Sequence, residues 1–243
     1  MLVAIDLLGH ANGPAAQKRR MLLALVITTT FAFGAWLARG VNTGGALAGS
    51  SIAFVLASND LRMFWILLLV FAVTLLATRA GKARKQELHT AEPSNGRSAS
   101  QVMANLGVAG LIVSLGPQNW PVLALAALAE AAADTSSSEI GMAFPGRTVL
   151  LTSWKPVAPG VDGGVSLKGT LAAIVAAAII ASAAVLMRLV SIPYAVAIGG
   201  AGILGSLVDS IFGALMERRG LLSNDVVNLL STAAAAGLVW IMS

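Results

Sequence analysis

Long apolar segments separated by short polar ones dominate the sequence from Met21 to Met242. None of them shows the alternation of polar and apolar residues that is typical of a half-buried strand. Backbone amides in hydrocarbon must be hydrogen-bonded within their own segment, so the pattern predicts membrane-spanning helices. The expected fold class is an all-α, polytopic transmembrane helical bundle of about seven or eight spans. The predicted spans are 21–38, 44–57, 63–78, 102–115, 120–133, 170–187, 194–215 and 226–242.

The composition supports a membrane protein. Of the 243 residues, 57% are hydrophobic and 11% are charged, against about 45–50% and about 25% in soluble domains. The absence of cysteine excludes disulfides, thiolate metal sites and a cysteine nucleophile. The two histidines, His10 and His89, show no ligand spacing, which argues against an imidazole-held zinc or haem. Any metal is therefore expected to be a hard cation held by oxygen.

The chain is expected to form one transmembrane domain, 21–243, after a short N-terminal segment. The apolar run in 1–20 is shorter than the roughly 20 residues that a spanning helix needs, so an interfacial or partly inserted segment is predicted. Residues 1–40 show no pattern of a plastid transit peptide, which favours a prokaryotic cell membrane over a plastid envelope.

The basic residues predict the orientation. If the loops 79–100, 134–168 and 216–225 are cytosolic, that side carries most of the 16 Lys and Arg residues. The net charge of +5 then reflects topology and contact with anionic lipid headgroups, and no nucleic-acid partner is expected.

Acidic residues mark the first candidate site. Glu130 and Asp134 lie four residues apart, on one face of the predicted helix, and Thr135, three serines and Glu139 follow. Carboxylates at a membrane boundary are costly unless they are paired, hydrated or bound to a cation. Oxygen ligands without a nearby base suggest Mg²⁺ with a phosphate ligand. Pairing of Glu130 and Asp134 with Arg or Lys from another helix is the alternative.

A glycine-rich stretch follows the acidic residues. Glycines free the backbone to point several N–H groups into one concavity, and Lys168 stands at the start of the next helix, where the helix dipole favours an anion. The stretch therefore suggests a polyphosphate site, although the spacing is not that of a Walker A loop and an ordinary glycine-rich turn is the alternative.

Two further polar features lie within predicted spans. Asp209 stands on a helix face of small residues, which indicates close approach of a neighbouring helix and makes Asp209 a functional candidate. Gln101 and Asn105 share a helix face, where they serve either interhelical hydrogen bonding or ligand binding.

Four ordered blocks together carry a family resemblance. RSASQVMAN, ADTSSSEIG, KPVxPGxDGGVSxKGT and GSLVDSIFGA resemble the signature blocks of the DUF92-type integral membrane family that includes plant phytyl-phosphate kinase of vitamin E synthesis and its bacterial and archaeal relatives. The resemblance implies an all-helical membrane enzyme that uses Mg²⁺ and a nucleoside triphosphate, CTP first, to convert an isoprenoid monophosphate to its diphosphate. A looser similarity to phosphatidate cytidylyltransferases and dolichol kinases is incomplete, because Lys155 stands alone where those relatives have two lysines.

Residues and resemblance together give the expected site. The catalytic residues would be Asp134, Asp209 and Lys168, and the Mg²⁺ ligands Asp134, Glu139 and Asp209. The expected nucleotide and phosphate ligands are Arg147, Lys155, Asp162, Gly163, Gly164, Ser166 and Asn105. The expected partners are the nucleoside triphosphate, the isoprenoid monophosphate and the lipid bilayer, with homo-oligomerisation left open. A CTP-dependent lipid nucleotidyltransferase and a non-enzymatic transporter or scaffold are the alternatives.

Overall fold

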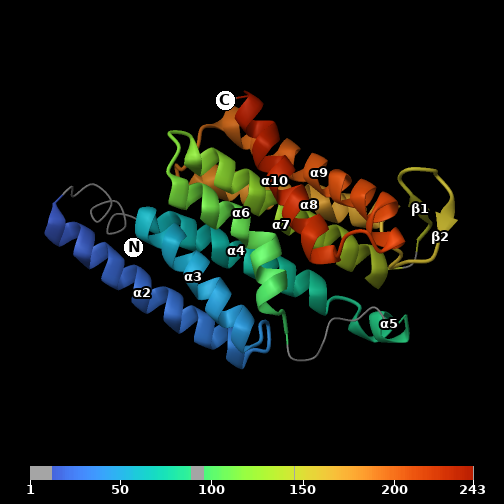
Figure 1. Ribbon diagram of the computed structural model, residues 1–243, viewed down its shortest axis with the longest axis horizontal. Coiled ribbons are helices and arrows are strands. Elements are labelled where there is room, and N and C mark those ends of the chain that lie inside the picture. The colour runs from blue at the N-terminus through green and yellow to red at the C-terminus, as the bar shows by residue number, and fades with distance from the viewer. Residues whose placement is uncertain (1–12, 89–95, 145, 243) are drawn as a thin grey trace.

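A computed structural model of the chain describes residues 13–88, 96–144 and 146–242, and Figure 1 shows them as a bundle of long helices. Within these ranges there are nine α-helices, one 3₁₀ helix and three short strands. The α-helices are α2 (Pro14–Leu37), α3 (Thr43–Asn59), α4 (Leu61–Arg79), α5 (Lys82–Glu87), α6 (Ala99–Leu115), α7 (Trp120–Ala143), α8 (Leu167–Leu186), α9 (Ile192–Leu215) and α10 (Asn224–Met242).

The predicted apolar spans correspond one by one to the long helices α2, α3, α4, α6, α7, α8, α9 and α10. Within the described residues, α2, α4, α8, α9 and α10 are long and apolar enough to cross a membrane, and α6 is a shorter apolar helix. Helix α3 has 17 residues, and the second half of α7 is polar. The prediction of an all-helical membrane bundle is confirmed.

Helix α7 is the centre of the bundle. It packs against α4, α6, α8, α9 and α10, and its stretch Val122–Ala133 is buried throughout. The stretch is rich in alanine, whose small side chain lets neighbouring helices approach on every side. The acidic residues of α7 therefore lie on the most enclosed element of the fold.

The predicted loop 134–168 is shorter in the structure, because α7 continues to Ala143. A Cβ atom on Gly169, at the start of α8, would lie 2.6 Å from the backbone oxygen of Ser137, so α8 packs directly on this part of α7. The remainder folds into an antiparallel sheet that the sequence pattern did not predict, in the order β2-β1-β3. The strands are β1 (Thr148–Leu150), β2 (Pro156–Val157) and β3 (Gly164–Ser166).

The predicted loop 79–100 contains the short helix α5, and the predicted N-terminal segment 1–20 overlaps α2, which begins at Pro14. Residues 1–12 and 89–95 lie outside the described residues. His10 and His89 belong to these two segments.

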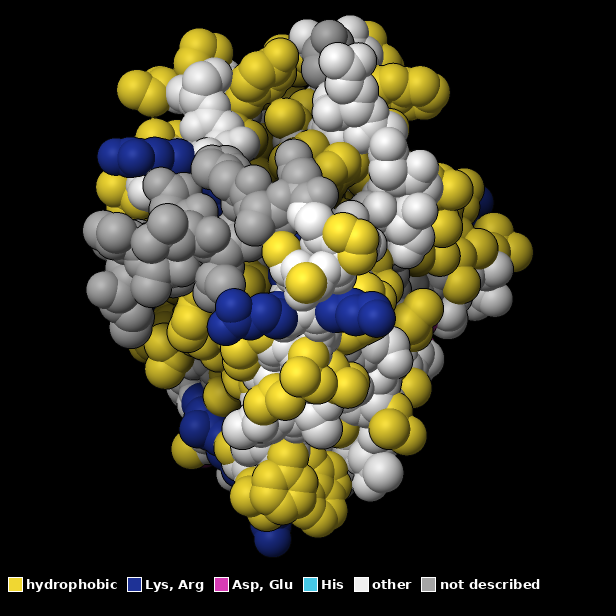
Figure 2. All heavy atoms as spheres, turned by 90° about the vertical axis from the view of Figure 1, so that its left-hand side faces the viewer, with side chains coloured by type: hydrophobic (Ala, Val, Ile, Leu, Met, Phe, Trp, Pro, Cys, Tyr) yellow, Lys and Arg dark blue, Asp and Glu magenta, His cyan; other side chains and the backbone are white. Residues whose placement is uncertain are grey.

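The two ends of the bundle differ. In Figure 1, β1 and β2 lie at the right-hand end of the bundle, and α5 lies below them toward the same end. Figure 2 shows the opposite end, where apolar and basic side chains are seen and no acidic side chain of the described residues is visible. It can therefore be tested whether the predicted loops 79–100, 134–168 and 216–225 lie on the same side of the membrane.

Single cysteines introduced into this cysteine-free chain test the topology. Ser153 and Ser223 are exposed at the end with the sheet, and Gln118 and Ser191 are exposed in connections at the other end. We expect a membrane-impermeant maleimide to label Ser153→Cys and Ser223→Cys from the cytosolic side, because that end is expected to carry most of the basic residues. Gln118→Cys and Ser191→Cys should react from the opposite side. Labelling of Ser153→Cys and Gln118→Cys from one side would contradict the arrangement.

Candidate metal and phosphate site

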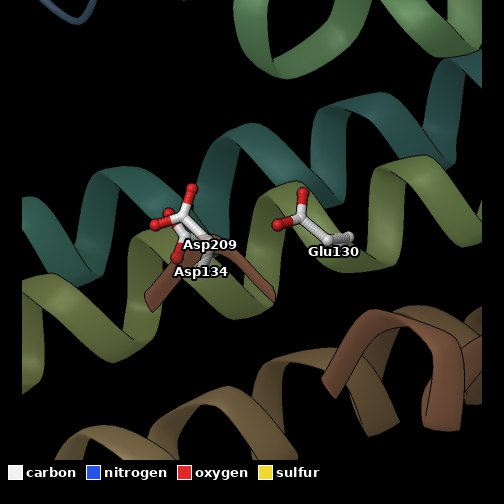
Figure 3. A group of neighbouring side chains, drawn as sticks. All are labelled: Glu130, Asp134 and Asp209. Carbon is white, nitrogen blue, oxygen red and sulfur yellow. The ribbon is translucent and has the colours of Figure 1, made fainter. Parts of the chain in front are cut away.

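Three carboxylates from two helices meet inside the bundle. Glu130 and Asp134 belong to α7, and Asp209 belongs to α9. One carboxylate oxygen from each residue lies within 4.8 Å of the others. Figure 3 shows Glu130 pointing along α7 toward Asp134 and Asp209. The spacing of four residues on α7 produces half of this arrangement, and the packing of α9 on α7 produces the rest.

Glu130 is the most enclosed of the three carboxylates. Its side chain is 1% exposed, and its Oε1 atom has no hydrogen-bond partner among the described residues. Asp209 has a partner, since its Oδ2 atom accepts a hydrogen bond of 3.3 Å from the Ser231 hydroxyl of α10. A buried carboxylate oxygen without a partner is costly and calls for a ligand or a proton. Three convergent carboxylates are a donor set that suits a hard divalent cation such as Mg²⁺.

Glycines on α9 make room for Glu130. A Cβ atom on Gly205 would lie 2.5 Å from Glu130 Cγ, and one on Gly202 would lie 3.0 Å from the backbone of Ala129. The small-residue face of α9 therefore allows the two backbones to approach as the sequence pattern predicts. This approach brings Asp209 to the face of α7 that carries the other two carboxylates.

A polar cavity of about 300 Å³ adjoins the carboxylates. Asp134 and Asp209 are part of its wall, and residues from all three predicted cytosolic loops contribute, including Arg97, Asp162 and Glu217. The cavity is markedly acidic, and Arg97 is the basic residue among the described residues that line it. The acidic side chains in the lining are Asp134, Glu139, Asp162, Asp209 and Glu217.

Five of the seven predicted nucleotide and phosphate ligands line this cavity, whereas the other two and the predicted catalytic residue Lys168 do not. Those in the lining are Asn105, Asp162, Gly163, Gly164 and Ser166. Arg147 and Lys155 are exposed beside the small sheet and are not part of the lining. Lys168 is also exposed, with its ammonium 6.0 Å from the centre of the Phe144 ring.

The glycine-rich stretch has a steric role that the sequence did not reveal. Gly163 has φ of +74°, and a Cβ atom there would collide with the backbone nitrogen of Ala214. Glycine at this position lets the loop lie directly on the end of α9, which fixes the neighbouring Asp162 at the cavity. The Ser166 hydroxyl caps α8 by accepting a 3.2 Å hydrogen bond from the Gly169 N–H.

The structure places Glu139, a predicted metal ligand, in an ion pair. Its Oε2 atom lies 2.6 Å from Lys85 Nζ, and the two side chains are 7% and 2% exposed. Lys85 Nζ also donates hydrogen bonds to the carbonyl oxygens of Ala77 and Thr78 at the end of α4. The pair joins α5 and α4 to α7, outside the three-carboxylate group. Lys85 was not among the predicted site residues.

Arg97 was not among the predicted site residues, although it begins the block RSASQVMAN. Its guanidinium donates hydrogen bonds of 3.3 Å to the hydroxyls of Thr74 and Thr78 on α4. Its backbone forms hydrogen bonds with Gly40 and Asn42. Glycine at position 45 permits this close approach, since a Cβ atom there would strike the Arg97 carbonyl. The side chain is thus held in place in the wall of the cavity that Asp134 also lines.

Other polar groups of the lining were also missed as site residues. Glu217 and Asn224 flank the turn between α9 and α10, and Asn228 lies one helical turn further along α10. In the sequence, Asn224 lies between Ser223 and Asp225, which can cap the last helix, so a structural role is as plausible as a site role. Only the tertiary arrangement brings these side chains to the cavity.

Comparisons with known proteins agree with the fold. A family model described as integral membrane protein DUF92 matches residues 26–236. The uncharacterized membrane protein MJ0933 of Methanocaldococcus jannaschii is 30% identical over 217 residues, covering 88% of this chain and 90% of that protein. Protein PGR of Arabidopsis thaliana is 28% identical, covering 86% and 83%. Protein VTE6, chloroplastic, of the same plant is 28% identical, covering 78% and 62%. No solved structure matches the chain.

The Lys85–Glu139 pair can be tested by a double-mutant cycle. Lys85→Met or Glu139→Gln alone should lower the free energy of unfolding by about 3 kcal/mol, because each leaves a polar partner buried without its counterpart. The double variant should lose less than the sum of the two single changes. Thermal and denaturant unfolding in detergent measure the effect, with Lys82→Met on the exposed side of α5 as control. Additive losses would show that the two side chains do not interact.

Proposed function

The chain belongs to the DUF92 integral membrane family, and we propose that it is a Mg²⁺-dependent prenyl-phosphate kinase. The reaction would transfer the γ-phosphate of a nucleoside triphosphate, CTP first among candidates, to an isoprenoid monophosphate in the membrane. An oxygen of the monophosphate would attack the γ-phosphorus as the bond to the β-phosphate oxygen breaks. The products would be the prenyl diphosphate and the nucleoside diphosphate.

The observation that carries this proposal is the meeting of three carboxylates within an otherwise apolar bundle, two of which, Asp134 and Asp209, line a polar cavity. Phosphoryl transfer to an acceptor that is already a phosphate needs no strong general base. It needs charge neutralisation and alignment of the two phosphates. The chain has no cysteine that could act as an acyl-transfer nucleophile. Its carboxylates therefore suit phosphoryl transfer better than acyl transfer.

The charge of the cavity makes a cation a requirement of the proposal. An acidic lining repels a bare nucleoside triphosphate, and Arg97 alone does not balance it. Glu130, Asp134 and Asp209 would hold Mg²⁺, which when bound neutralises phosphate charge. The metal set proposed from the structure thus contains Glu130, whereas Glu139 pairs with Lys85.

The remaining lining residues would position the substrates. Arg97, fixed by its two threonine partners, would bind a phosphate, and Asn105 would donate from its amide. Loop 162–164 would form the nucleotide side of the cavity. Arg147, Lys155 and Lys168 are exposed at this end of the bundle, where they would attract the anionic nucleotide.

The acceptor is assigned from the family resemblance. The signature blocks imply an isoprenoid monophosphate, and one relative, VTE6, is a chloroplast protein. A bundle that spans a membrane also suits an acceptor with a long apolar tail. A nucleotidyltransferase would use the same residues, but the lipid phosphate would attack the α-phosphorus of the nucleotide. The two reactions can therefore be distinguished by which phosphate of the nucleotide is transferred to the lipid.

Removing single carboxylates tests the site. Asp134→Asn and Asp209→Asn keep nearly the same volume but each removes an anionic ligand. Turnover should fall by roughly 10²-fold or more in each case. The variants should remain folded, since neutralising an enclosed carboxylate relieves desolvation. Asp225→Asn, at the same end of the bundle but outside the cavity lining, is the matched control. Wild-type turnover in Asp134→Asn or Asp209→Asn would return these residues to a structural role.

Isotope labelling tests the reaction. Purified protein is incubated with prenyl monophosphates and CTP that is labelled at the γ- or the α-phosphate, with and without EDTA. We expect γ-label in prenyl diphosphate, α-label in the nucleotide, and no turnover after chelation. Entry of α-label into the lipid would indicate nucleotidyl transfer. If neither label moves with any prenyl phosphate, the proposed activity is wrong.

A further inference from the structure

An apolar pocket lies beside the polar cavity, between α2, α3, α4 and α6. Its volume is about 70 Å³. Apolar side chains and two glycines form most of its wall, and Thr74 and Arg97 lie at its polar side. The apolar wall includes Phe31, Ala35, Gly49, Leu67, Phe71 and Leu106.

The pocket and the cavity share part of their walls. Arg97, Gln101 and Asn105 line both, so these three polar side chains separate an apolar space from an acidic one. The pocket also reaches Ala131, the residue that follows Glu130 on α7. An elongated ligand in the pocket therefore ends beside the three carboxylates.

We propose that this pocket holds the first part of the apolar tail of the lipid monophosphate, with its phosphate against Arg97, Gln101 and Asn105. This proposal rests on the proposed function, which supplies a phosphate-bearing lipid. Such a ligand would bind on both sides of the shared wall. Its tail would be buried away from water in the apolar pocket, and its phosphate would accept hydrogen bonds from the Arg97 guanidinium. The Thr74 and Thr78 hydroxyls hold that guanidinium in position.

Helix α2 forms the outer wall of the pocket. It packs chiefly on α3 and little on α4, and Ala24, Thr28 and Ala35 are its buried residues. Most of α2 thus faces outward, as Figure 1 shows at the edge of the bundle. The pocket is too small for a whole prenyl chain, so the rest of the tail would continue past α2 into lipid.

Gly49 offers a way to fill the pocket. A Cβ atom there would meet only Val102 Cγ1, at 3.8 Å, which is ordinary contact. Gly49→Leu should therefore occupy pocket space without a backbone clash. Gly34→Leu on α2 is the matched control, because Gly34 is exposed and a Cβ atom there would meet nothing within 4 Å.

The experiment uses farnesyl monophosphate that carries a diazirine in its first isoprene unit, bound to the whole protein in lipid nanodiscs without nucleotide. Peptide mass spectrometry locates the adducts after illumination. We expect them in α2, α3 and α4 at positions that line the pocket, with excess unlabelled farnesyl monophosphate suppressing them. Gly49→Leu should weaken this labelling about tenfold, the effect of about two methylene groups kept out of an apolar site. Gly34→Leu should label like the wild type.

The outcomes separate this inference from the proposed function. Adducts confined to α8, α9 or α10 in the wild-type protein would overturn the tail site, even if γ-label transfer occurs. Unchanged labelling in a folded Gly49→Leu variant would do the same. Competed adducts in the pocket together with no γ-label transfer would support the tail site and reject the kinase. The adduct map of the wild type decides the question even if Gly49→Leu does not fold.

Discussion

The structure depends on keeping three carboxylates together inside an apolar helix bundle. A single charged residue at the centre of a membrane helix costs about 2.5–3.5 kcal/mol by insertion scales, and the cost rises when like charges lie close together. Glu130, Asp134 and Asp209 meet within 4.8 Å, and Glu130 is almost wholly enclosed. Only a compensating ligand or proton, and a tightly built surrounding, makes this arrangement tenable. The central position of α7 and the glycines of α9 provide that surrounding.

The acidic residues of α7 are divided between two roles. Glu139 is neutralised by Lys85 and ties α5 to the bundle, which is a structural arrangement. Asp134 and Glu130 lie five and nine residues earlier on α7. Among the described residues neither forms an ion pair with a lysine, and both face Asp209. If these carboxylates served only packing, pairing each with a basic side chain, as Glu139 is paired with Lys85, would have lowered the cost of burying them. The clustering of the unpaired acids is therefore the feature that favours a functional site.

The sequence predicted the helices well, because each apolar span is a local signal of length and periodicity. It also predicted the candidate residues Asp134 and Asp209, since an isolated acid in an apolar helix is conspicuous by itself. It did not predict Arg97, the partner of Glu139 or the steric role of Gly163. Each of these depends on contacts between segments far apart in the chain, such as Lys85 with Glu139 and Gly163 with Ala214. Lys168 is the reverse case, because a residue that the local motif indicated is exposed outside the cavity lining.

On the proposed function, the geometry gives each substrate its own approach. The polar cavity lies where loops from one end of the bundle converge, so a nucleotide would arrive from water. The apolar pocket lies behind α2, so a lipid tail would arrive from the membrane. Both spaces end at the stretch 131–134 of α7, and Arg97, Gln101 and Asn105 stand between them. The helix that holds the core together is therefore also the place where two repelling phosphates would have to meet, which explains why its carboxylates are enclosed rather than at the surface.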